Sequence, residues 1–469
     1  MTSPHPKSAA SGSLRSPLQA LPANLHWVYL LFAVPLVIFL AFRTPAFQSP
    51  DEIAHFYRSY QVAHGGLFAR GGGYVDSGIE RLYACVFRLQ YHTAAHMTSD
   101  EIACERSVRW SGTMSYQSFP NTAAYFPVNY IPQAIGVLAG QAFNLSMFNT
   151  LILSRLLNAA ASIILCVLAL SVCCRGKVLM FALLLLPMTL SLFASASQDA
   201  TLIALASLAL SFISRQLDSS VPMTRATGIV VFSAILAIAI GRPPNAALAL
   251  VFFIPGLLPL RSKTGQRLAA LTLISVTVAI TLAWWIAVIL ASRGISHPYM
   301  AGGNVDPKMQ VANLLHHPQI LGALWGYFVS HISYYIAAVI GLLGWLDTPM
   351  PGPYYLAMIL VLLAAMFAEF GRGSVNPRRG AAIIFSAAFI GIVGVFFIEY
   401  LLFTPVGGTD LNGTQGRHLL PLLIAAAAGV PSISASEKSY KRVTALVVAA
   451  QLITVFVLPQ VIMARYYGG

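Results

Sequence analysis

The sequence predicts an all-α integral membrane protein that crosses the bilayer many times. Two observations predict this fold class. Of the 469 residues, 57% are hydrophobic and only 9% are charged, whereas soluble globular chains carry roughly 25% charged residues. Apolar runs of about 18 residues or more, the length that a helix needs to span a bilayer, also recur along the chain. These observations exclude a soluble globular protein.

The charge distribution is the third observation that bears on the fold class. The formal net charge is +13, which on its own would suit a nucleic-acid-binding protein. The basic residues, however, fall mostly in short loops between apolar runs, which is a signal of membrane topology. We therefore expect the lipid bilayer, and no nucleic acid, as the partner of this charge.

The first elements are a polar tail and an anchor. Residues 1–24 are rich in serine and proline and are predicted to be a cytoplasmic tail. The apolar run from Leu25 to Phe42 is too long for a signal peptide and lacks a small-residue cleavage site. It is therefore predicted to remain as the first span. Residues 25–463 are predicted to form one transmembrane domain, and residues 464–469 a C-terminal tail.

The first loop, residues 44–149, is too long to be a simple connector. It contains Cys85 and Cys104, for which a disulfide is predicted if the loop is extracytoplasmic. The loop ends in a short apolar segment, Pro127 to Phe143, which contains Pro132 and two glycines. We expect this segment to lie at the membrane surface rather than to cross the membrane.

Long apolar runs follow the loop. They are Leu151 to Cys174, Val178 to Ser195, Ala200 to Ile213, Gly228 to Ile240, Ala246 to Leu260, Leu268 to Leu290, Ile320 to Leu343, Tyr354 to Phe370, Ala381 to Phe403, Leu419 to Val430 and Val443 to Met463. The basic loops all lie inside if Pro127 to Phe143 does not cross and if Ile320 to Leu343 is broken near His331. About eleven spans then cross, and most acidic residues lie outside. Thirteen simple crossings would scatter the basic loops over both faces.

The stretch that follows the first span concentrates polar chemistry. The Ser-Pro pair before Asp51 is typical of a helix start, which places Asp51 and Glu52 among the free N–H groups of the first turn. Asp51, His55 and Arg58 fall at i, i+4 and i+7, on one helical face. A capping role would need only one acid. Local sequence leaves both capping and a functional role open for Asp51.

Further polar residues fall at predicted outer ends of spans, where unpaired groups would be costly. They are Gln198, Asp199, Arg242, Arg293, His297, His316, His317, Asp347, Glu399, Asp410, Gln415, Arg417 and His418. Asp199 can be an N-cap, can face a cavity, or both. Arg242 and Arg417 each suit interfacial snorkelling or bidentate binding of phosphate oxygens. Two such arginines near several acids favour a lipid with a phosphate headgroup as the ligand.

A metal site is not predicted. Adjacent histidines such as His316 and His317 point about 100° apart on a helix, and spacing fixes no third ligand. A divalent metal cofactor stays possible without being required by the sequence. Glu399 lies about one turn inside its helix end and is a candidate partner for an arginine.

Three motifs resemble a known family. They are Pro50-Asp-Glu-Ile-Ala-His55, Gly341-Leu-Leu-Gly-Trp-Leu-Asp347, and Gln415-Gly-Arg417 with Pro421. They resemble a bacterial family of polytopic membrane proteins that is itself similar to the GT-C glycosyltransferases, a group that includes protein mannosyltransferases and aminoarabinose transferases. The resemblance runs from about Leu25 to Met463. It departs from the GT-C pattern because no large soluble C-terminal domain is evident.

The resemblance implies a GT-C-like fold in the bacterial inner membrane. It implies a hexosyl or pentosyl transferase that moves a sugar from a polyprenyl phosphate or diphosphate to an envelope glycan, lipid or protein on the periplasmic side. The implied acid after the first span matches Asp51, with Glu52 as its neighbour, and a second acid after the third span matches Asp199.

On this hypothesis Asp51 or Glu52 is the general base, and Asp199 orients the acceptor or assists a metal. Arg242 and Arg417 bind the lipid phosphate, and His55 and Arg58 position Asp51. Expected further contacts to substrate come from Gln198, Asp347, Gln415 and His418. The alternatives are a lipid flippase or transporter, which binds the same headgroup without chemistry, and a non-catalytic subunit of a polysaccharide assembly system.

Overall fold

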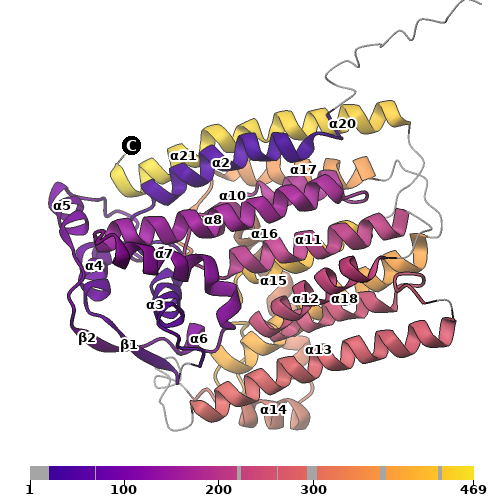
Figure 1. The fold of residues 1–469 in the computed structure, drawn as a ribbon, viewed down its shortest axis with the longest axis horizontal. Coiled ribbons are helices and arrows are strands. Elements are labelled where there is room, and N and C mark those ends of the chain that lie inside the picture. The colour runs from indigo at the N-terminus through magenta and orange to yellow at the C-terminus, as the bar shows by residue number, and fades with distance from the viewer. Residues whose placement is uncertain are drawn as a thin grey trace, which may run out of the picture.

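A computed structural model describes residues 21–68, 70–218, 223–260, 262–292, 304–369, 377–430 and 436–468. Most of these residues are helical (Figure 1). This confirms a mainly α-helical chain. Most of the predicted N-terminal tail, the residues Arg293 and His297, and part of the basic loop before Arg379 lie outside the described residues.

The elements follow one another along the chain as follows. The α-helices are α2 (Leu25–Arg43), α3 (Glu52–Ala63), α4 (Gly78–Val86), α5 (Ser99–Ser107), α6 (Pro120–Ala123), α7 (Ile131–Ala142), α8 (Met147–Val172), α9 (Lys177–Leu184), α10 (Pro187–Phe193), α11 (Asp199–Asp218), α12 (Arg225–Gly241), α13 (Lys263–Ala291), α14 (Pro307–His316), α15 (Ile320–Ser330), α16 (Ile332–Gly341), α17 (Gly352–Glu369), α18 (Pro377–Phe403), α19 (Leu420–Gly429), α20 (Glu437–Ala450) and α21 (Leu452–Tyr467). The short 3-10 helices are η1 (Phe87–Leu89), η2 (Pro127–Tyr130), η3 (Pro243–Phe253) and η4 (Gly416–Leu419). Strands β1 (Gly72–Asp76) and β2 (Met114–Ser118) form one antiparallel pair, and β3 (Leu342–Leu343) and β4 (Thr348–Pro349) form another.

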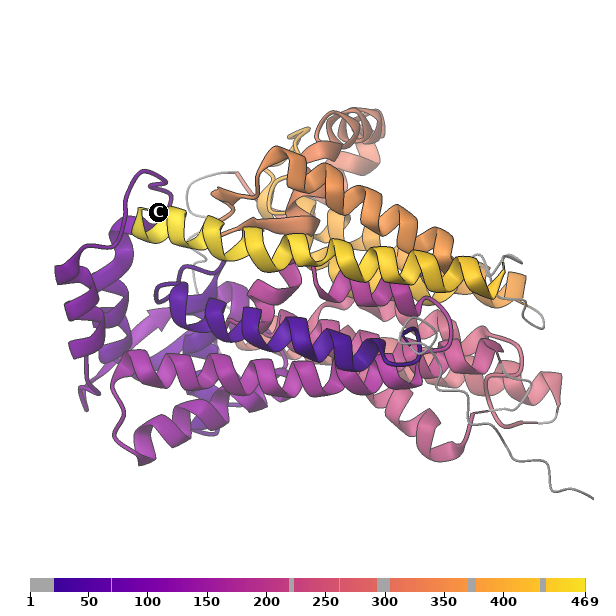
Figure 2. The ribbon, with the colours of Figure 1, turned by 90° about the horizontal axis from the view of Figure 1, so that it is seen from above.

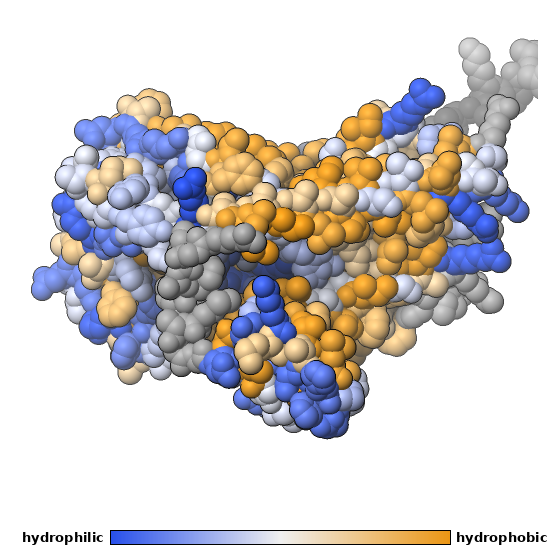
Figure 3. Space-filling model, turned by 90° about the horizontal axis from the view of Figure 1, so that it is seen from below, coloured by the Kyte–Doolittle hydropathy of each residue, from blue (hydrophilic) through white to orange (hydrophobic). Residues whose placement is uncertain are grey.

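Several helices have the length and composition of membrane spans. Among the described residues, six helices qualify: Leu25–Arg43, Met147–Val172, Asp199–Leu217, Lys263–Ala291, Arg379–Phe403 and Glu437–Tyr467. The bent pair α15 and α16 makes a seventh candidate. The surface agrees, because Figure 3 shows a largely hydrophobic band between two hydrophilic ends. A membrane location follows, while the count of about eleven crossings stays a prediction.

Two apolar runs of the sequence are broken in the structure. Ile320 to Leu343 bends by 56° between α15 and α16, at His331, which confirms the predicted break there. Val178 to Ser195, expected as one continuous run, is instead the two short helices α9 and α10. Pro187 begins α10, because its ring and missing N–H prevent the preceding turn from continuing.

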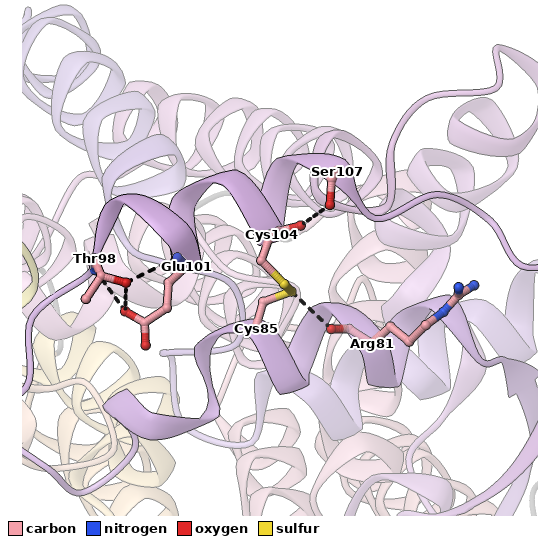
Figure 4. The surroundings of a disulfide bond; sticks show 6 residues. All are labelled: Arg81, Cys85, Thr98, Glu101, Cys104 and Ser107. Carbon is pink, nitrogen blue, oxygen red and sulfur yellow. Dashed lines mark hydrogen bonds between the residues drawn. A yellow bond between two sulfur atoms is a disulfide. The ribbon is translucent and has the colours of Figure 1, made fainter.

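The first loop forms a layer at one end of the long helices, on the left in Figure 1. It holds α3 to α7 and the sheet of β1 and β2. The disulfide between Cys85 and Cys104 joins α4 to α5 (Figure 4), which confirms the predicted pairing. The segment Pro127 to Phe143 becomes η2 and α7, and the 12 residues of α7 are too few to cross a bilayer.

The C-terminal helix closes the bundle against the N-terminal one. Figures 1 and 2 show α21 beside α2, and the two helices are in contact. Near the C-terminal end of α21, Arg465 donates to the carbonyls of Leu89 and Ala95 in the first loop. The last helix therefore fastens the loop that carries Asp51 and Glu52.

Candidate active site

Asp51 lies at the start of α3 in a conformation that turns its side chain away from a capping role. It is the residue before the helix, with a positive φ of 58°, and its side chain makes no capping hydrogen bond. The helix thus begins at Glu52, later than the Ser-Pro pair predicted. Asp51 Oδ2 instead accepts from Nη2 of Arg417, and Oδ1 accepts from Asn121 at 3.3 Å. The side chain is 24% exposed.

Arg417 connects the two predicted acids. Its Nη1 donates to the carbonyl of Pro50 at 2.7 Å, its Nη2 donates to Asp51, and its Nε lies 3.6 Å from Oδ2 of Asp199. Arg417 is buried within η4, and the glycine before it allows this position. A Cβ on Gly416 would lie 2.3 Å from backbone atoms of α16, so η4 packs closer to α16 than any other residue would permit.

Asp199 and Arg242 complete the network. Asp199 opens α11 and is buried, and its Oδ1 accepts from Nη2 of Arg242 at 3.0 Å. Arg242 directly follows α12 in an extended conformation, since the two prolines that follow prevent the helix from continuing. Asp51, Arg417, Asp199 and Arg242 form one continuous chain of opposite charges. We call these four residues the acid–arginine network.

His55 is a buried neutral link to this network. Its Nδ1 lies 2.6 Å from the hydroxyl of Tyr130, and its Nε2 lies 3.2 Å from Oγ of Ser197, which accepts from the backbone N–H of Asp199. Burial and the charges of Arg417 and Arg242, against the opposing effect of Asp51, lower the pKa of His55 to about 3. His55 therefore holds the turn before Asp199 in place, whereas the sequence predicted that His55 would position Asp51.

A second pair lies next to the acid–arginine network. His418 Nδ1 is 3.1 Å from Oε1 of Glu399, on α18. The predicted partner of Glu399 was an arginine, and the partner in the structure is this histidine. Glu399 also interacts electrostatically with all four members of the acid–arginine network. The site thus gathers three carboxyl groups, two guanidinium groups and two histidines from segments far apart in the sequence.

Glu52 is buried in an ion pair and is not accessible to a substrate. It is fully buried and makes a two-point ion pair with Arg155, at 2.8 Å and 2.6 Å. Its Oε1 also accepts from the backbone N–H of Ala196 at 3.0 Å. Between the two neighbouring acids, Asp51 alone is partly open, which makes it the candidate base.

Arg155 is the functional-site neighbour that sequence reasoning missed. It donates to the carbonyls of Ala41, Thr44 and Pro45 as well as to Glu52. A signal was present, because an arginine inside the apolar run of α8 needs a partner at membrane depth. Through Glu52 and the Ala196 N–H, Arg155 holds together the two backbone segments that carry Asp51 and Asp199.

Besides Glu52, His55 and His418, four more predicted residues lie outside the network. Arg58 donates to the carbonyls of Gly66, Leu67 and Tyr125 and to Gln61 rather than to Asp51. Asp347 pairs with Arg465 at 3.1 Å. Gln198 is buried and donates to the carbonyl of Gly241 at 3.2 Å. Gln415 precedes η4, and its Oε1 is buried without a hydrogen-bond partner among the described residues.

The predicted alternatives for a metal stay open. In the described part of the chain, no group of three His, Cys, Asp or Glu side chains has the geometry of a metal site. Figure 3 shows a hollow with a hydrophilic floor between hydrophobic walls, on the face below α13 and α14 in Figure 1. A ligand with a polar head and an apolar tail matches a surface of this kind.

Comparison with known families gives one result. A family model described as "Predicted membrane protein (DUF2142)" matches residues 35–426. The chain belongs to this family. The match with DUF2142 includes the whole acid–arginine network and the Glu52–Arg155 pair. Searches of curated proteins and of solved structures give no match.

Proposed function

We propose that the protein is a membrane glycosyltransferase of GT-C type. It moves a sugar from a polyprenyl phosphate or diphosphate to an acceptor on the outer side of the bacterial inner membrane. The observation that carries the proposal is Asp51, a partly exposed carboxylate that makes no capping hydrogen bond and lies beside Arg417 in a network with Asp199 and Arg242. The neighbouring Glu52, in contrast, is fully buried and paired with Arg155.

The reaction we propose is a single displacement at the anomeric carbon. The acceptor hydroxyl oxygen forms a bond to that carbon while the bond from carbon to phosphate oxygen breaks, and the electron pair leaves with the phosphate. The hydroxyl proton goes to Asp51. Its Oδ1 suits this role, because its contact with Asn121 is long at 3.3 Å and a base must lie within hydrogen-bond reach of the proton.

The two arginines suit the leaving phosphate. Nε of Arg417 has no hydrogen-bond acceptor among the described residues, since Asp199 is 3.6 Å away. That N–H, together with Arg242 beside it, can donate to phosphate oxygens as negative charge develops on them. A phosphate needs less acid assistance to leave than an alkoxide does, so one base and one arginine pair are sufficient.

One observation favours a lipid flippase as the second candidate. Bent membrane helices with polar breaks are typical of transporters, and α15 and α16 meet at a 56° bend near His331. Transporters of this kind pair such breaks in two halves of the chain. The part of the chain that the structure describes contains one bent pair by this criterion, which is why we place the enzyme first.

Turnover of a lipid-linked sugar distinguishes the two candidates. Purified wild type, Asp51→Asn and Glu437→Gln are incubated with polyprenyl-phosphate sugars from the native membrane, and products are counted by mass spectrometry. We expect Asp51→Asn to lose turnover by about 10²–10⁴-fold and to keep its bound polyprenyl phosphate. Glu437, an exposed residue of α20, is the matched control and should have no effect.

The opposite results overturn the proposal. Wild type that retains polyprenyl phosphate but consumes no donor supports the flippase, as does an Asp51→Asn variant that transports lipid normally. An Asp51→Asn variant with full turnover would remove Asp51 from the chemistry. Thermal unfolding of each variant shows whether a lost activity is a lost fold.

A further inference from the structure

A cavity lies apart from the acid–arginine network. It has a volume of about 420 Å³, and its lining is Phe42, Arg43, Ile102, Glu105, Arg106, Phe148 and Tyr467. The volume is within the usual range for sites that bind small molecules. None of these residues belongs to the network, and the cavity does not depend on the proposed transfer.

Three membrane spans end at this cavity. Arg43 is the last residue of α2, Phe148 is the second residue of α8, and Tyr467 is the last residue of α21. Helix α5 of the first loop supplies Ile102, Glu105 and Arg106 as the remaining wall. A cavity bounded by span ends on one side and a loop helix on the other lies at the depth of lipid headgroups.

Two guanidinium groups of the cavity are available to a ligand. Arg43 and Arg106 are both exposed, and neither has an ion pair or a side-chain hydrogen bond among the described residues. Glu105, the acid in the wall, is 4% exposed and is occupied as acceptor of the backbone N–H of Ala46 at 2.8 Å. Burial raises the pKa of Glu105. The lining holds two arginines and this one acid, so its net charge is positive.

An apolar stripe leads away from the cavity along α2. Trp27, Leu31, Ile38 and Phe42 are 45–68% exposed, and their spacing of four, seven and four places them on one face of the helix. The stripe ends at Phe42, which is itself part of the cavity wall. The arginines that can bind a lipid headgroup therefore lie next to an apolar surface that can contact acyl chains.

We propose that this cavity binds an anionic glycerophospholipid from the leaflet on the side of residues 44–146. Arg43 and Arg106 hold the phosphate, and the acyl chains lie along the stripe of α2. Guanidinium groups match phosphate oxygens in geometry and charge. Glu105 lines the cavity and accepts a hydrogen bond from the backbone N–H of Ala46. A lipid that packs against Glu105 therefore also stabilises the chain segment that leads to Asp51.

The test compares three probes on the full-length protein in uncharged detergent. Phosphatidylglycerol, phosphatidylcholine with the same chains, and inorganic phosphate are titrated, and the melting temperature and the lipid retained in native mass spectrometry are measured. The variant is Arg43→Gln/Arg106→Gln. The matched control is Arg81→Gln/Arg109→Gln, because these two exposed arginines line a different cavity beside the disulfide (Figure 4 shows Arg81).

We expect phosphatidylglycerol to raise the melting temperature of the wild type and of the control. The Arg43→Gln/Arg106→Gln variant should need roughly 30-fold more of this lipid for the same rise, since each of the two interfacial arginines contributes about 1 kcal/mol and about 1.4 kcal/mol corresponds to tenfold. Arg106→Gln alone, on the surface of α5, should show a smaller loss in the same direction.

Three results would overturn the proposal. The first is an equal response of both double variants to phosphatidylglycerol. The second is an equal effect of phosphatidylcholine, because the site would then not select an anionic lipid. The third is reproduction of the effect by inorganic phosphate alone, because the site would then be a site for free anions.

Discussion

Removing the Glu52 carboxylate tests whether the buried pair with Arg155 holds the site together. In Glu52→Gln, the side chain keeps its shape, but Arg155 loses its counter-charge in a fully buried position. Its three backbone acceptors, the carbonyls of Ala41, Thr44 and Pro45, are neutral. Breaking one partner of a buried ion pair costs about 3–5 kcal/mol, because the remaining charge is left uncompensated.

The size of the thermal shift follows from chain length. At about 2.1 cal/mol/K per residue, unfolding of 469 residues has an entropy on the order of 1 kcal/mol/K. A loss of about 3–5 kcal/mol therefore lowers the melting temperature by about 3–5 °C. The assay is thermal unfolding of purified variants in detergent, with Lys441→Gln as control, since the Lys441–Glu437 pair is exposed and such pairs contribute little.

A double variant sharpens this test. In Glu52→Gln/Arg155→Met both charges are gone, so the desolvation cost of the lone guanidinium disappears. We expect the double variant to melt above Glu52→Gln, although the carbonyls of Ala41, Thr44 and Pro45 then lose the N–H groups of Arg155 as donors. The reasoning would be refuted if Glu52→Gln melted at the wild-type temperature, or if the double variant melted lower still.

Two further predictions concern the surroundings of the acid–arginine network. The pKa of His55 is about 3 in the fold and about 6.5 when unfolded, so the stabilisation from neutral His55 is complete above pH 6.5 and falls by about 2 kcal/mol by pH 5. The melting temperatures of wild type and His55→Gln should therefore converge as the pH falls from 7.5 to 5. A constant difference between them would contradict the assignment. Gly416→Ala should lower both melting temperature and turnover, because its Cβ meets the α16 backbone at 2.3 Å and displaces Arg417. Gly352→Ala, with nothing within 4 Å of the added carbon, is the control, and equal behaviour of the two variants would exclude close packing as the cause.

Composition and periodicity predicted the fold class well because they report directly on the solvent around each helix. The low charge content, the short segment before Phe143 and the break near His331 all depend on local sequence and bilayer thickness. The break at Pro187 also has a local signal, since a proline ends the preceding turn. It was not predicted, because the run from Val178 to Ser195 is apolar on both sides of the proline. What local sequence lacks is the depth of each helix, so the number of crossings stays a prediction.

The candidate site was predictable in its members more than in its pairings. Asp51, Asp199, Arg242 and Arg417 were selected because each lies at a helix end, where an unpaired charge is costly. Which of two adjacent acids stays open could not be predicted. That choice depends on Arg155, which is 103 positions from Glu52 and was visible only as an arginine in an apolar run.

The separation between Asp51 and Arg417 also sets an order for biosynthesis. Arg155 follows Glu52 by 103 residues, whereas Arg417 follows Asp51 by 366. At about 5–20 residues per second, the second interval lasts roughly 20–70 s. The ribosome thus delivers the pair that shapes the backbone long before the arginine that meets Asp51. A nascent chain that stops short of η4 contains both members of the Glu52–Arg155 pair but lacks the arginine that meets Asp51.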